Sequence, residues 1–156
     1  MHMPRVLFVC TGNVFRSLTA EFALRKALGT SSIIVTSAGT ADIPFAVRPF
    51  VADYLFSRGL DVSGHRRRTL TPAMLLEPGP VIAMSTEHRV VLAERFNCMG
   101  VPLFTEACGL VGEPLPDVDE VVPDHETNRP AFEAHVRMII DQIIELTPLL
   151  KNRLAS

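Results

Sequence analysis

The stretch VLFVCTGNVFRSLTAEFA, residues 6–23, passes from an apolar run to a turn pattern and then to a helical pattern. Its apolar start predicts a buried strand that ends at Cys10, Gly12 and Asn13 predict a tight turn, and Arg16 stands where a helix begins. Glycine and asparagine enter left-handed backbone conformations most cheaply, so the turn can curl until its N–H groups point inward. Such a nest at a helix N-terminus binds anions. The stretch therefore predicts an anion-binding loop with a thiol at its floor and a guanidinium at its rim.

Two other kinds of phosphate-binding loop are excluded, because the chain has neither a G-K-[ST] sequence nor a G-x-G-x-x-G sequence. The attacking form of a cysteine is the thiolate, and an ordinary thiol is mostly protonated at neutral pH. A helix dipole contributes at most about 2 kcal/mol toward ionising it. We therefore expect Arg16, the Ser17 hydroxyl and the loop N–H groups to stabilise a Cys10 thiolate. Arginine also forks onto two oxygens of a phosphoryl group.

Outside this stretch, short apolar runs alternate with helical patterns, which is typical of βαβ units around a parallel sheet. The predicted strands are residues 5–10, 33–36, 81–84 and 101–104. The predicted helices are residues 17–28, 50–58, 71–76, 85–97 and a long one that starts at Asn128. We expect one domain, residues 1–156, with an α/β fold: a three-layer sandwich with a central four-stranded parallel sheet and about five helices.

Composition narrows the function classes. The chain has 156 residues, 47% of them hydrophobic, and a net charge of −2, which predicts a soluble globular protein without a field for nucleic acid or anionic lipid. The basic run Arg66–Arg68 is interpreted as a solvated edge. No apolar stretch reaches the roughly 18 residues of a membrane helix, and no signal-peptide core is found. Three cysteines form no C-x-x-C pair. We expect a cytoplasmic protein that binds neither nucleic acid nor membrane.

The pattern C-x5-R-S, Cys10 to Ser17, resembles the signature of the low-molecular-weight protein tyrosine phosphatases. The resemblance extends in the family's order over nearly the whole chain, through the segments TSAGTADIP, GLDVSGHRRRTLT, VIAMSTEHRV and VVPDHETNRPAFEAHV. It implies a phosphotyrosine protein phosphatase I-like fold. It also implies transfer through a phosphocysteine on Cys10, with no metal and no cofactor. The implied partners are a protein substrate that carries phosphotyrosine, and inorganic phosphate or a similar oxyanion in the site.

The resemblance also assigns roles to individual residues. Cys10 is the nucleophile and Arg16 grips the phosphate, which is bound by residues Thr11, Gly12, Asn13, Val14, Phe15, Arg16 and Ser17. An aspartic acid protonates the leaving group and later activates water. Two Pro-Asp pairs compete for this role, and we choose Asp124 for its spacing from Phe132, with Asp117 and Asp119 in reserve. A web of Asn13, Ser37, His65 and Ser17 supports the loop.

Four departures from the family pattern change the expectations. Phe15 stands where members often have a second cysteine, so disulfide protection of the nucleophile is absent. The chain has no tryptophan, and Phe45 and His125 are the remaining candidates for the substrate cleft. Phosphotyrosine and other phosphomonoesters therefore both stay open as substrates. Ser85 replaces an aspartate and is expected only to cap a helix. The loop between Asp124 and the last helix is about one residue shorter than usual.

Two alternatives stay open. Thiol-dependent arsenate reductases also read CTGN and relay oxidation through two further cysteines, for which Cys98 and Cys108 are the candidates here. Both have apolar neighbours, which favours small buried side chains over a relay. A catalytically weak phosphate or phosphopeptide-binding module would need the anion nest but neither nucleophile nor acid.

Overall fold

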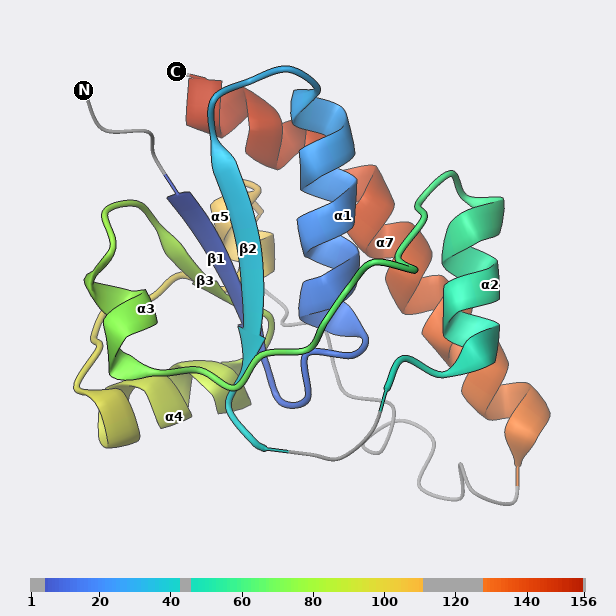
Figure 1. Ribbon diagram of the computed structural model, residues 1–156, viewed down its shortest axis with the longest axis horizontal. Helices are drawn as coiled ribbons and strands as arrows, with labels where there is room; N and C mark the ends of the chain where they lie inside the picture. Colours follow the sequence, from blue (N-terminus) through green and yellow to red (C-terminus); the bar gives the residue numbers. More distant parts are fainter. Residues whose placement is uncertain (1–4, 43–45, 111–127, 156) are drawn as a thin grey trace.

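The computed structural model describes residues 5–42, 46–110 and 128–155. Its strands and helices alternate along the chain as the sequence predicts (Figure 1). The elements are β1 (Arg5–Cys10), α1 (Arg16–Leu28), β2 (Ile34–Gly39), α2 (Pro49–Ser57), α3 (Pro72–Leu76), β3 (Val81–Ala83), α4 (Thr86–Phe96), α5 (Phe104–Ala107) and α7 (Arg129–Ala155). The α/β class and the parallel sheet flanked by helices are confirmed.

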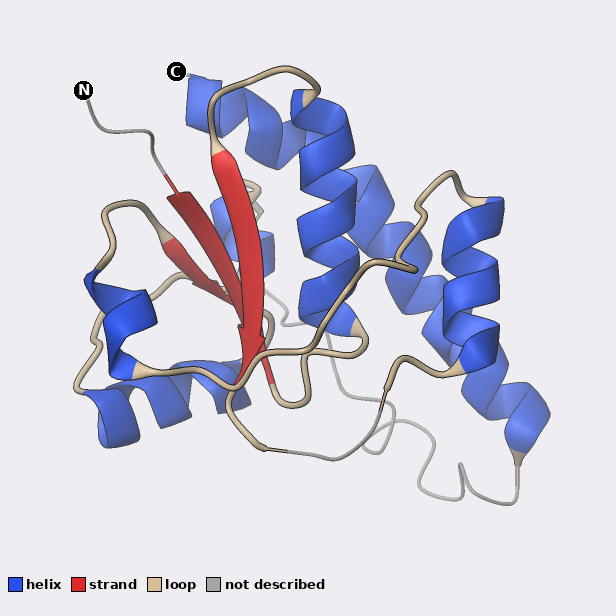
Figure 2. Cartoon of the chain, viewed as in Figure 1, coloured by secondary structure: helices blue, strands red, loops and turns tan. Residues whose placement is uncertain are grey.

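The sheet has the order β2-β1-β3, and all of its strands are parallel. All six residues of β1 are buried, as expected for a central strand with helices on both sides. Because side chains alternate along a strand, Val6 and Phe8 pack toward α1, α5 and α7, whereas Leu7 and Val9 pack toward α4. Figure 2 shows the helices on either side of the strands. This arrangement buries β1 completely and brings its carboxyl end to one edge of the sheet.

The predicted fourth strand, residues 101–104, is wrong within the described part of the chain. It is reduced to an isolated bridge between Ala83 and Leu103, and residues Phe104–Ala107 form helix α5. The cause is local. The Glu106 side chain accepts the backbone N–H of Leu103 at 2.8 Å, and Pro102 has no N–H to donate. The sheet therefore has three strands and a bridge.

Helix α7 closes the core on the α1 side. It begins after Asn128, whose side-chain oxygen accepts the backbone N–H of Ala131 at 3.3 Å, as the sequence predicts for this cap. One face of the helix is buried against α1 and α2, through Phe132, Val136, Ile139, Ile140 and Ile143. Among the described helices, none has the length and apolar character needed to cross a membrane.

Candidate active site

The loop of residues 11–15 joins β1 to α1 at the carboxyl end of the central strand, where parallel sheets bind ligands (Figure 1). Asn13 has φ of 58°, a left-handed conformation that lets the loop curl back over the strand end. Cys10 and Arg16 are each only 3% exposed. The N-cap residue of α1 is Phe15, whose side chain has no group that could cap the first N–H groups of the helix. The thiol and the guanidinium predicted to act together are thus brought to one end of the sheet.

Two hydrogen-bond donors surround the sulfur of Cys10. The backbone nitrogen of Asn13 lies 3.3 Å from Sγ, and Ser17 Oγ lies 2.9 Å from it. Asn13 Nδ2 donates to Ser17 Oγ at 2.9 Å, which leaves the Ser17 hydroxyl hydrogen able to donate to the sulfur when Cys10 is a thiolate. Both contacts stabilise negative charge on the sulfur.

The predicted supporting web is brought together, and it contains a residue that the sequence analysis missed. Asn13 Nδ2 donates to Ser37 Oγ at 2.7 Å, and Ser37 Oγ donates to Glu21 Oε1 at 2.5 Å. Hydrogen bonds therefore connect the carboxylate of Glu21 through Ser37, Asn13 and Ser17 to Cys10. Its spacing in the sequence could have indicated Glu21, because it lies four residues after Ser17 and therefore on the same face of α1.

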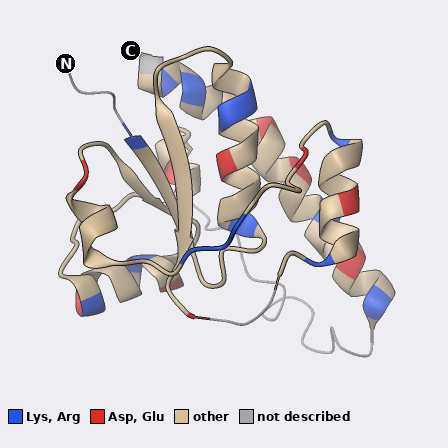
Figure 3. Cartoon of the chain, in the orientation of Figure 1, with Lys and Arg blue, Asp and Glu red and all other residues tan. Residues whose placement is uncertain are grey.

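A basic segment supports the loop from outside, and Figure 3 shows it crossing the end of the sheet. His65 Nε2 donates to the carbonyl oxygen of Asn13 at 2.8 Å, and the Arg68 backbone N–H donates to Asn13 Oδ1 at 2.9 Å. Arg67 donates to the carbonyl oxygens of Gly12, at 3.0 Å, and Ala41, at 2.7 Å. The interpretation of Arg66–Arg68 as a solvated edge is therefore wrong for Arg67, which is bonded to the loop.

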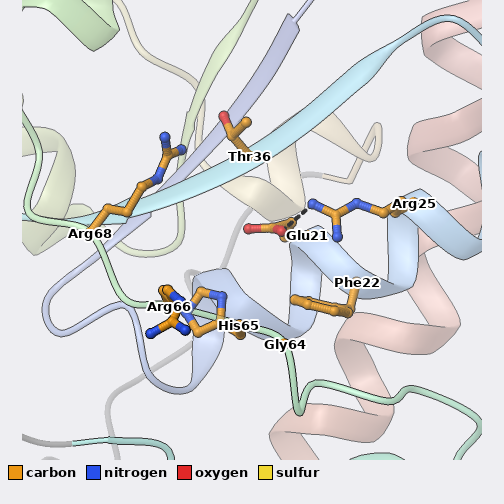
Figure 4. A pocket seen from close by; sticks show the side chains of 8 residues that line it. All are labelled: Glu21, Phe22, Arg25, Thr36, Gly64, His65, Arg66 and Arg68. Carbon is orange, nitrogen blue, oxygen red and sulfur yellow. Dashed lines mark hydrogen bonds and ion pairs between the residues drawn. The ribbon is translucent and has the colours of Figure 1, made fainter.

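A pocket of about 220 Å³ opens behind the loop. Glu21, His65 and the arginines Arg25, Arg66 and Arg68 line it (Figure 4). Arg25 forms an ion pair with Glu21, which holds the carboxylate where it also accepts from Ser37. The lining of the pocket thus includes Glu21, the end of the hydrogen-bond web that is farthest from Cys10, but it does not include Cys10 itself.

Gly39 lies against the loop, because it pairs in register with Cys10 on the neighbouring strand. A Cβ atom at Gly39 would lie 2.5 Å from the carbonyl oxygen of Thr11 and 3.0 Å from the carbonyl carbon of Gly12. Both are backbone atoms, so a side chain at this position forces the loop to move.

We expect Gly39→Ala to lower the free energy of unfolding by ~1–3 kcal/mol through this overpacking, and to lower phosphate affinity. Gly64→Ala is the matched control, since a Cβ atom there has no neighbour within 4 Å. Its effect should stay within ~0.5 kcal/mol. Urea denaturation measures both variants, and equal effects would contradict the close approach of Gly39 to the loop.

His88, also missed from the sequence, is completely buried on α4 beside the loop. Its Nε2 lies 2.9 Å from Thr11 Oγ1 and 3.4 Å from a terminal nitrogen of Arg16. Its Nδ1 accepts the backbone N–H of Ser85 at 3.1 Å. Burial, and secondly the charge of Arg16, lower the pKa of His88 from 6.5 to about 3. The imidazole is therefore neutral at physiological pH.

This pKa predicts a pH effect on stability. Unfolded chains protonate His88 near pH 6.5, whereas the folded chain does so only near pH 3. The unfolded state thus binds more protons in this window, and acid destabilises the fold. Between pH 7 and pH 5 the free energy of unfolding should fall by about 2 kcal/mol more in the parent protein than in His88→Asn. Urea denaturation at both pH values tests this, and equal losses would contradict the neutral histidine.

The remaining predicted residues have different outcomes. Phe15 precedes α1 and packs partly buried against the core, and Thr11, Gly12 and Val14 lie in the loop. Phe45, His125 and the aspartates Asp117, Asp119 and Asp124 lie outside the described residues, so their roles stay predictions.

The other two cysteines do not form a thiol relay with each other. Cys108 packs with β1, α1 and α7, whereas Cys98 packs on the opposite side of the sheet. Burial raises the pKa of the Cys108 thiol to about 11. Since the thiolate is the reactive form, these observations disfavour the reductase alternative.

Comparison with known proteins adds three findings. A family model described as low molecular weight phosphotyrosine protein phosphatase matches residues 5–155. The low molecular weight protein-tyrosine-phosphatase Etp of Escherichia coli is 36% identical over 84 residues, which cover 53% of this chain and 55% of Etp. The chain thus spans about half the length of this curated relative. The protein-arginine-phosphatase of Bacillus subtilis is 27% identical over 145 residues, 88% of this chain and 95% of that protein.

Among solved structures, the YwlE arginine phosphatase, in a mutant with a phosphorylated active-site serine, superposes with a TM-score of 0.81. The match covers 97% of this chain and 96% of that chain at 22% identity. At this identity the likeness supports the fold alone. The parallel sheet flanked by helices is therefore a fold that this solved structure shares.

Proposed function

Because the chain belongs to the low molecular weight phosphotyrosine protein phosphatase family, we propose that it hydrolyses phosphomonoesters through a phosphocysteine on Cys10. Proteins that carry phosphotyrosine are the proposed substrate class. One observation carries the proposal: the sulfur of Cys10 lies beside two hydrogen-bond donors, Ser17 Oγ and the Asn13 N–H, with Arg16 buried at the start of the same helix. The nucleophile and the arginine that binds phosphate thus lie at the two ends of one loop.

We also propose a cytoplasmic location, which the free cysteines support.

In the first step, the thiolate of Cys10 attacks phosphorus in line with the leaving oxygen. The S–P bond forms while the P–O bond to the leaving group breaks, and the Arg16 guanidinium and the loop N–H groups hold the three equatorial oxygens. We assign to Asp124 the proton that the leaving oxygen receives.

In the second step, water attacks phosphorus of the phosphocysteine. Asp124, now a carboxylate, takes a proton from this water, and the S–P bond breaks to return the thiolate and release inorganic phosphate. The donors around the sulfur stabilise the thiolate as a leaving group, so the contacts that favour attack also favour its departure.

If Asp124 is the general acid, its replacement should lower activity most for substrates whose leaving group must be protonated. Asp124→Asn should lower kcat/KM, which reports the first step, by about 10²-fold for a substrate with a basic leaving group, and much less for p-nitrophenyl phosphate, whose leaving group needs little protonation. Asp117→Asn is the matched control and should stay close to the parent protein. If Asp117→Asn has the larger loss, the acid is Asp117, and Asp124 has been assigned wrongly.

Hydrolysis of phosphotyrosine and phosphoserine peptides by the purified chain tests the substrate class. We expect release of phosphate from phosphotyrosine at a higher kcat/KM. Tight phosphopeptide binding without turnover would favour a binding module instead.

Arginine phosphatase activity is a second candidate, because the arginine phosphatase of Bacillus subtilis aligns with 88% of this chain. The same nucleophile and phosphate grip would act on a P–N bond, with the proton delivered to the departing guanidine nitrogen. A phosphoarginine peptide of the same sequence as the phosphotyrosine peptide decides between the two. A higher kcat/KM for phosphoarginine would replace tyrosine by arginine in the proposed substrate.

A further inference from the structure

Helix α4 brings a histidine to the loop, and its local sequence determines which ring nitrogen carries the proton. Ser85 is the N-cap and His88 is the third residue of the helix, the position at which a capping box has a side-chain acceptor. Here the acceptor is His88 Nδ1, which receives the Ser85 backbone N–H at 3.1 Å. A backbone N–H can only donate, so Nδ1 has no proton and the neutral ring carries its hydrogen on Nε2.

The Nε2–H group therefore donates to Thr11. Nε2 and Thr11 Oγ1 are 2.9 Å apart, and the Thr11 hydroxyl is directed to Glu87 Oε1 at 3.5 Å. Thr11 directly follows the nucleophile, and its carbonyl oxygen accepts the Ala41 N–H at 3.0 Å. His88 and Ala41 thus hold the first residue of the loop by its side chain and its backbone.

The same nitrogen lies 3.4 Å from the guanidinium of Arg16. Because Nε2 carries a hydrogen, it does not accept from Arg16, and the contact presents an uncharged ring to a cation. A carboxylate at this position would add negative charge beside the groups that bind a phosphate dianion and stabilise the thiolate. Among the described residues, Arg16 from α1 is the charged group in contact with the ring, and Glu87 on the same helix as His88 accepts the hydroxyl of Thr11.

We infer that His88 is a positioning residue of the phosphate site, which fixes Thr11 through Nε2–H and presents an uncharged ring to Arg16. The inference rests on the proposed function. The backbone N–H of this helix cap sets the tautomer of His88 and so directs its proton to the loop.

Two substitutions separate this role from helix capping. In His88→Asn, the shorter amide places its oxygen near the position of Nδ1, so it keeps the cap but cannot reach Thr11. In His88→Gln, the longer amide reaches Thr11 and loses the cap. A positioning role predicts that Asn weakens phosphate binding by about tenfold and Gln by no more than about twofold, although Gln is the less stable variant. If His88 only caps the helix, His88→Gln should weaken phosphate binding more than His88→Asn does.

The measurement is the concentration of inorganic phosphate that halves the rate at which iodoacetamide alkylates Cys10, followed on the Cys10 peptide by mass spectrometry. This measurement needs no turnover. Absence of hydrolysis by the parent protein would therefore contradict the proposed function without deciding the role of His88. Adding Thr11→Val to His88→Asn should change phosphate protection by less than about twofold, because both remove the same hydrogen bond. If the two substitutions instead weaken phosphate protection independently, so that the loss in the double variant is the product of the two single losses, the inference is wrong.

A third variant tests the charge. His88→Glu has the shape of His88→Gln and differs by one negative charge next to Arg16. Its alkylation profile should shift to higher pH by about one unit relative to Gln, and phosphate protection should weaken at least about tenfold. Identical profiles for Gln and Glu would show that an uncharged neighbour is not required, and this part of the inference would be wrong.

Discussion

Replacing Cys10 by serine is expected to lower kcat by ~10⁴-fold or more, the largest effect of any substitution in the chain. The contacts of Cys10 Sγ explain the size of the loss. Ser17 Oγ and the Asn13 N–H stabilise an anion, and neither is a base that could remove a proton from a serine hydroxyl. The reactive form of a cysteine is the thiolate, whereas a serine hydroxyl needs a base before it can attack phosphorus.

The measurement is the hydrolysis of p-nitrophenyl phosphate under single-turnover conditions, together with the mass of the intact protein. Cys10→Ser should still bind inorganic phosphate, because the loop N–H groups and Arg16 are retained. Cys98→Ser is the matched control and should keep the parent rate, since Cys98 packs away from the loop. A Cys10→Ser variant with nearly the parent rate would exclude the phosphocysteine mechanism.

Arg16→Lys is expected to lower kcat by about 10³-fold, although it keeps the positive charge. Arg16 is 3% exposed at the first position of α1, so its guanidinium is held in place and its planar fork can hold two phosphoryl oxygens at once. A lysine ammonium is a point charge on a flexible stem, and it cannot replace the second of these contacts.

Arg66→Lys provides the comparison, because Arg66 is an exposed arginine of the same region. It should remain within about twofold of the parent protein. The discriminating measurement is kcat and KM for p-nitrophenyl phosphate. A fall in kcat for Arg16→Lys indicates lost stabilisation of the transition state, whereas a change in KM alone would reduce Arg16 to a binding residue.

Local sequence was sufficient for the centre of the site. The strand, the loop and the start of α1 lie within residues 5–28, and the apolar run and Asn13 favour the conformation that the structure has, although Gly12 does not take the positive φ that it would allow. The apolar face of α7 was predictable for the same reason, because a helix repeats its buried positions every three or four residues. Family resemblance added Ser37 and His65, which the structure brings to Asn13.

The error at the fourth strand was also local. Residues 101–104 have the apolar character of a strand, but a side-chain acceptor three residues later, Glu106, takes the Leu103 N–H and starts a helix. Hydrophobicity reports burial, and Leu103 is buried as predicted, at 2% exposed. It does not report which group accepts a particular N–H, so the burial was predictable and the strand was not.

The sequence by itself determined the chemistry at the end of β1: a thiol, a turn able to bind an anion, and an arginine at the helix start. Only the tertiary structure decided what holds that chemistry in place. Ser37 meets Glu21 across 16 residues, Gly12 meets Arg67 across 55, and Thr11 meets His88 across 77. Short-range preferences follow from the backbone and its nearest neighbours, whereas these contacts exist because parallel strands bring distant carboxyl ends to one edge of a sheet.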